Sequence, residues 1–110
     1  MEYLELIFLF IVAHLFGDYV FQSEYIATTK GKNYYHLFVH CMIYTFCFWC
    51  VFFYFNKINS VLLLLVFISH FIIDLAKCVL NAKNPSKSKM YYVIDQLLHY
   101  AIILLITFLI

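Results

Sequence analysis

Four stretches of this sequence are apolar over the length that a helix needs to cross a membrane. They are residues 3–22, 35–55, 61–80 and 91–110 of a 110-residue chain, and a spanning helix needs about 20 mostly apolar residues. Because 66% of the residues are hydrophobic, a soluble domain of this size could not bury so much apolar surface. The sequence therefore predicts an all-α fold, a polytopic membrane four-helix bundle that forms a single transmembrane domain over residues 1–110.

The polar breaks between these spans differ in charge. The second break carries only Lys57, whereas the first and third carry five lysines: Lys30, Lys32, Lys83, Lys87 and Lys89. Loops rich in lysine stay in the cytoplasm, so we expect both longer loops inside and both termini on the extracytoplasmic side. The net charge is only +1 and arginine does not occur, which argues against nucleic acid as a partner.

The ionisable residues within the spans form pairs spaced four residues apart, and these pairs contain all five histidines and all three aspartates. They are His14–Asp18, His36–His40, His70–Asp74 and Asp95–His99. Residues i and i+4 lie on one helix face. Because successive spans run in opposite directions, the pairs predict two layers about 6 Å apart. The deep layer would contain His14, His40, His70 and His99, and the shallow layer Asp18, His36, Asp74 and Asp95.

This arrangement indicates a metal site. A carboxylate at membrane depth costs about 2.5–3.5 kcal/mol, and we expect only Lys77 to lie near enough to compensate. All eight paired residues are therefore candidate ligands for one or two divalent ions, with zinc as the first expectation and manganese or iron as alternatives. Asp18, Asp74 and Asp95 are the candidate catalytic carboxylates. Three further residues are candidates to orient the ligands: Gln22, Lys77 and Gln96.

The ordered motifs resemble a known family. They are HLFGDYVFQ with a following KGK, then HLFVH, HFIID-x-x-K and DQLLH. Together they resemble the small bacterial membrane proteins catalogued as domain of unknown function 3307. That resemblance implies a multi-pass protein of the bacterial inner (cytoplasmic) membrane and no particular activity. The inward histidines and acids are also loosely similar to those of predicted membrane-bound metal-dependent hydrolases.

Several functions fit these features. The first hypothesis is a metal-dependent hydrolase that acts on a lipid or phosphoester at the cytoplasmic face. The alternatives are a divalent-cation or proton transporter or channel subunit, a membrane di-iron oxygenase, and a non-catalytic assembly subunit in which the polar network only joins helices. We expect the lipid bilayer to surround the protein. Two further partners stay open: a second copy of the chain in a homo-oligomer, and a soluble cytoplasmic protein.

Overall fold

The computed structural model describes residues 2–110, and within that range it is helical with no strand. Four helices are long and apolar enough to cross a membrane, which confirms the predicted fold class. The elements in chain order are α1 (Glu2–Leu15), η1 (Phe16–Val20), α2 (Glu24–Thr29), α3 (Tyr34–Tyr54), α4 (Ser60–Lys83), η2 (Pro85–Lys87) and α5 (Ser88–Leu109).

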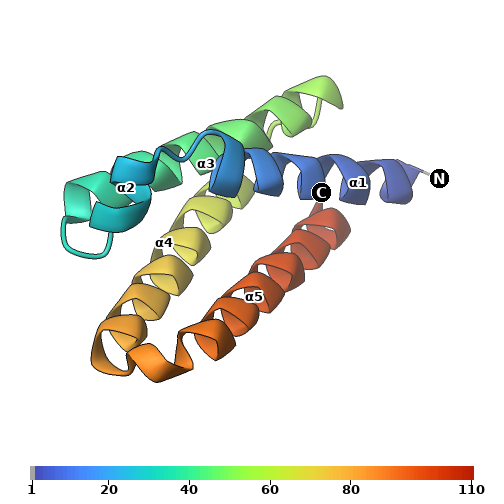
Figure 1. The fold of residues 1–110 in the computed structure, drawn as a ribbon. Helices are drawn as coiled ribbons and strands as arrows, with labels where there is room; N and C mark the ends of the chain where they lie inside the picture. The colour runs from blue at the N-terminus through green and yellow to red at the C-terminus, as the bar shows by residue number, and fades with distance from the viewer. Residues whose placement is uncertain (1) are drawn as a thin grey trace.

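The long helices form an antiparallel bundle. Contacts join α1 to α3, α3 to α4, α4 to α5, and α5 back to α1, so each helix packs against two others. Figure 1 shows α2 and the α4–α5 turn at one end of the bundle, with both chain termini at the other. The five lysines of the two longer breaks therefore belong to the same end, as the alternation of spans predicted.

The end of the bundle that contains the termini is filled by apolar side chains. Phe10 of α1 stacks on Phe48 of α3 at a centroid distance of 5.4 Å, and its edge meets Phe52 at 5.5 Å. These rings are buried together with the branched side chains Leu6, Leu62, Val66, Ile103 and Ile106. Dispersion contacts in such a core hold membrane helices together, since the surrounding lipid is equally apolar.

The first span does not end as a regular helix. After Leu15 the chain makes one turn of π-helix, in which the amide of Phe21 donates to the carbonyl of Phe16. Gly17 and Asp18 are both buried within this turn. Single π turns interrupt the regular ladder and often occur at functional sites, and this one carries a candidate ligand.

Gly17 sets the spacing between the π turn η1 and α3. A Cβ at this position would lie 2.8 Å from Cδ2 and 3.0 Å from Cα of Tyr44. The second atom is backbone, so the Gly17→Ala variant must push the helices apart. We expect it to lower the free energy of unfolding by about 1–3 kcal/mol, measured by denaturant titration in micelles. Ala101→Val, on an exposed position of α5, is the control and should change little.

The first break contains a short helix that the sequence analysis missed. Ser23 begins α2 by accepting a hydrogen bond from the amide of Ile26, and the helix lies against α3. Gly31 then approaches α4 so closely that an added Cβ would be 2.8 Å from Cβ of Cys78. This contact brings the neighbouring Lys30 to the bundle interior, where it is only 5% exposed.

Candidate metal centre

Asp18 lies at the middle of the polar interior, facing two imidazoles from other helices. Its Oδ1 is 3.2 Å from Nε2 of His40 and 3.3 Å from Nε2 of His70. The two imidazole nitrogens are 2.8 Å apart. Both histidines are fully buried, and Asp18 is nearly so. Three ligand atoms from α3, α4 and the π turn therefore converge on one point.

The size of this triangle matches the geometry of a zinc site. Zinc bonds to nitrogen and carboxylate oxygen are about 2.0–2.1 Å long, so ligand atoms at the corners of a tetrahedron lie about 3.3 Å apart. The three edges of the triangle are 2.8–3.3 Å long. The group Asp18, His40 and His70 thus has the spacing of three protein ligands, and a catalytic site leaves the fourth position for water or substrate.

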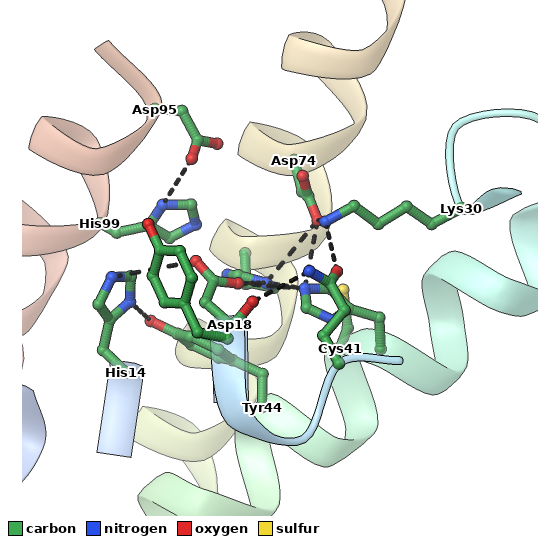
Figure 2. Close-up of polar contacts among 12 residues, drawn as sticks. His14, Asp18, Lys30, Cys41, Tyr44, Asp74, Asp95 and His99 are labelled. Carbon is green, nitrogen blue, oxygen red and sulfur yellow. Dashed lines mark hydrogen bonds and ion pairs between the residues drawn. The ribbon is translucent and has the colours of Figure 1, made fainter. Parts of the chain in front are cut away.

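The other two carboxylates are compensated by lysine. Lys30 Nζ lies 2.7 Å from Oδ2 of Asp74, and Lys77 Nζ lies 3.2 Å from Oδ1 of the same residue. Lys77 also reaches Asp95, with Nζ 3.7 Å from Oδ2. Figure 2 shows Lys30 extending from the α2 side to Asp74. Asp18 has no ion pair with a lysine within residues 2–110, so its charge is the one left for another cation.

Lys30 corrects the charge balance that we expected. The prediction that only Lys77 lies within reach of the three aspartates was wrong, because the close approach of Gly31 to α4 brings Lys30 to Asp74. Two lysines against three carboxylates leave one negative charge when the histidines are neutral. One divalent ion with a bound hydroxide would bring the buried cluster to neutrality, which a medium of low dielectric favours.

His14 is held by hydrogen bonds on both sides of its ring. Nε2 is 2.9 Å from Oε1 of Gln96, which can only accept, so this nitrogen carries the proton. Nδ1 then accepts from the hydroxyl of Tyr44 at 2.8 Å. With both nitrogens occupied, His14 is placed to orient its neighbours. Gln96 in turn donates to Oδ2 of Asp95 at 3.0 Å and reaches Oδ2 of Asp18 at 3.5 Å.

A second group of ligand atoms shares Asp18 with the first. Asp18, Asp95 and His99 each offer one atom within 4.8 Å of the others. His99 Nδ1 is 3.5 Å from Oδ2 of Asp95. Neither ring nitrogen of His99, nor Oδ1 of Asp95, forms a hydrogen bond with any residue that the structure describes. These buried atoms have free donor and acceptor capacity beside the first group.

Of the eight predicted ligands, five belong to the two ligand groups, His14 and Asp74 lie beside these groups, and His36 lies apart. Its Nδ1 is 2.6 Å from Oγ1 of Thr29, and its ring packs against Tyr25 at a centroid distance of 5.1 Å. Both partners belong to α2, which covers the first turn of α3. His36 therefore forms a contact between α2 and α3 on the outer side of the cluster, and it lies in neither ligand group.

Two residues at the centre were missed by the sequence reasoning. Tyr44 stacks on His70 with ring centroids 3.7 Å apart and an interplanar angle of 11°, and its hydroxyl orients His14. It continues the four-residue spacing of His36 and His40 by one turn, which is a signal that the sequence does contain. Lys30 gave no such signal, because its burial depends on the irregular chain around Gly31.

Gln22, which we expected to orient the ligands, lies at the edge of this cluster. Its amide nitrogen donates to the carbonyl of Asp18 at 3.0 Å, and its oxygen accepts from Lys30 at 2.8 Å. Gln22 thereby links the backbone of the π turn to the lysine that compensates Asp74. The link ties the position of Asp18 to the packing of α2 over the bundle end.

Comparison with known proteins gives one match. A sequence model of the family described as "Protein of unknown function (DUF3307)" matches residues 6–110. No curated protein and no solved structure matches the chain. The matched range includes every residue of the polar cluster.

Proposed function

We propose that this chain, which belongs to the DUF3307 family, is a metal-dependent phosphoester hydrolase of the bacterial inner membrane. The lysine-rich end of the bundle would face the cytoplasm, and both termini the other side. The observation that carries the proposal is the triangle formed by Oδ1 of Asp18 and the Nε2 atoms of His40 and His70. Zinc fits this set of ligands best, since imidazole with carboxylate is its usual environment.

A divalent ion held by Asp18, His40 and His70 would supply activation of a water molecule as a nucleophile at neutral pH. Asp95 is the best acceptor for the water proton, because its Oδ1 has no hydrogen-bond partner among the described residues and the carboxyl group lies beside Asp18. Attack of the water oxygen on phosphorus would break the bond from phosphorus to the alcohol oxygen. The proton held by Asp95 then passes to the leaving alcohol oxygen, which gives free alcohol and phosphate.

Lysine ammonium groups beside the ion suit an anionic substrate. Lys77 is between Asp74 and Asp95 and is partly exposed, with 19% of its side-chain surface open. A phosphate group that enters the site can take a hydrogen bond from this ammonium group while one oxygen approaches the metal. The ammonium group of Lys77 would stabilise an uncharged carboxylic ester less than it stabilises a charged phosphate.

Transport is a less favoured function than hydrolysis. An ion that crosses the bundle from the polar cluster toward the termini would meet the core built around Phe10, Phe48 and Phe52. Transporter sites usually lie where access can alternate between the two sides. The tightly packed rings on one side of the cluster favour access from the other side alone, which is what an enzyme needs.

Elemental analysis of the purified protein tests the metal proposal. Wild-type protein should contain about one equivalent of zinc, and His70→Ala should contain almost none, because one of three ligands is removed. His36→Ala is a matched control that also removes a histidine of the predicted set. It should retain the metal, because His36 bonds to Thr29 and lies outside the triangle.

Two results would contradict the proposal. Wild-type protein that takes up no divalent metal after incubation with excess zinc would support the purely structural network instead. Equal loss of metal from His36→Ala and His70→Ala would show that the triangle is not the binding site. Release of inorganic phosphate from phosphate monoesters in proteoliposomes, compared with flux of zinc across the same membranes, separates a hydrolase from a transporter.

A further inference from the structure

We infer that a groove between α4 and α5 binds the acyl chain of an anionic phospholipid, with the phosphate at Lys77. The inference deepens the proposed function, since it names a membrane lipid as the substrate class. Hydrolysis of the bound lipid would rest on the proposed function. Binding of the lipid does not rest on it, because the groove and the metal triangle are made by different residues.

The groove opens on the outer surface of the bundle and has a volume of about 280 Å³. This lies at the lower edge of the range for small-molecule sites, which suits one narrow chain. Its walls are apolar side chains of the two helices: Ile72, Ala76, Leu80, Tyr91, Ile94 and Leu98. Ala76, the smallest of them, leaves the space that larger residues at this position would fill.

Two charged side chains of the polar cluster also line this groove. They are Lys77 and Asp95, which form an ion pair with each other. Asp95 further belongs to the ligand group that shares Asp18. The groove is therefore continuous with the metal centre, and a phosphate at Lys77 would lie beside the proton acceptor. An attached chain would then run along the groove toward Ile72 and Leu98.

The charge at the end of the groove favours an anionic lipid. The α4–α5 turn carries three exposed lysines, Lys83, Lys87 and Lys89, close to Leu80 and Tyr91 in the sequence. Clusters of lysine at the cytoplasmic surface attract anionic headgroups. A water-soluble phosphoester would use the same lysines but would leave the apolar walls without an occupant. The combination of charge and groove thus points to a lipid.

A second groove on the same bundle provides a comparison. It is lined by Met42, Thr45, Phe46, Trp49 and Leu63, with a volume of about 340 Å³. The two grooves are similar in size, but no charged side chain lines the second. If apolar volume alone decided occupancy, both would take any lipid equally. If the charge of Lys77 decides, only the α4–α5 groove will prefer an anionic one.

The test uses tryptophan fluorescence in bilayers that contain brominated lipids, which quench a nearby indole. Trp49 is the chain's single tryptophan and reports on the second groove. The variant Leu98→Trp with Trp49→Phe reports on the α4–α5 groove. There we expect brominated phosphatidic acid to bind about five-fold more tightly than brominated phosphatidylcholine. At Trp49 the two lipids should quench equally.

Blocking the groove separates a seated chain from simple surface attraction. Ala76→Phe should abolish the preference at Leu98→Trp, whereas Thr45→Phe, which fills the second groove, should leave it unchanged. A preference that survives Ala76→Phe would show that the exposed lysines act alone and would overturn the inference. Equal quenching by both lipids in the unblocked reporter would overturn it as well.

Native mass spectrometry gives a second measurement that needs no reporter residue. Wild-type protein and Thr45→Phe should retain phosphatidic acid, and Ala76→Phe should lose it; retention by all three would contradict the groove. The same comparison in Asp18→Asn distinguishes the two proposals. Lipid retained by that variant supports the groove whatever becomes of hydrolysis, and lipid lost from the metal-loaded wild type overturns it even if hydrolysis is found.

Discussion

Asp18→Asn is expected to lose the bound metal and, with it, hydrolysis of phosphate esters by about a thousand-fold. Asp18 is the carboxylate of the triangle with His40 and His70, and it has no lysine partner within the described residues. Loss of residues that merely orient ligands already lowers metal affinity 10–100-fold, so loss of a ligand itself should lower it further. A metal ion contributes several kcal/mol to such a reaction, which corresponds to about three orders of magnitude in rate.

Asp95→Asn is the matched control for this prediction. It removes the same charge from the same cluster, but Asp95 pairs with Lys77 and is the residue that we propose as the proton acceptor. We therefore expect this variant to keep about one equivalent of zinc while its turnover falls about 10²–10⁴-fold, the usual contribution of a general base. Metal content by elemental analysis and phosphate release by the same preparations give the two readouts.

The two variants together can contradict the single-ion arrangement. If wild type contains two equivalents of metal and Asp95→Asn contains one, the group Asp18, Asp95 and His99 holds a second ion. The count of two lysines and one ion against three carboxylates would then no longer account for all the charge in the cluster. If Asp18→Asn keeps both its metal and its activity, the triangle plays no part in binding and the proposed function is lost.

The fold was predictable because membrane spans are a local property of the sequence. About 20 apolar residues in a row determine a spanning helix whatever its neighbours are, and the structure has four helices long and apolar enough to cross a membrane. The common level of the ligands was also predictable. It follows from the four-residue spacing and the alternating direction of helices, which bring His70 of α4 against His40 of α3.

The details of the centre depend on irregular backbone, which carries no periodic signal. His36 and His40 lie one turn apart on the same face of α3, yet only His40 reaches Asp18. The difference arises from α2, a six-residue helix too short to show apolar periodicity. Lys30 follows that helix and was assigned to a solvated loop for the same reason, although it is buried.

Lys30→Met should be the most destabilising single change among the lysines. Removing one partner of a buried ion pair costs about 3–5 kcal/mol, because the other charge stays buried. Lys30 and Asp74 are both almost completely buried, with Nζ 2.7 Å from Oδ2. Lys77 still faces Oδ1 of Asp74, so we expect a loss near the lower limit, about 3 kcal/mol in the free energy of unfolding, measured by denaturant titration in micelles.

The double variant Lys30→Met with Asp74→Asn identifies the origin of this loss. Replacing both charges with neutral groups is often nearly neutral in stability, so most of the loss should be recovered. Lys32→Met, two residues away and exposed, should change the free energy of unfolding by less than about 0.5 kcal/mol. Equal effects of Lys30→Met and Lys32→Met would mean that Lys30 does not compensate Asp74. The cluster would then carry a second uncompensated carboxylate and would need more positive charge than one hydroxide-bound ion supplies.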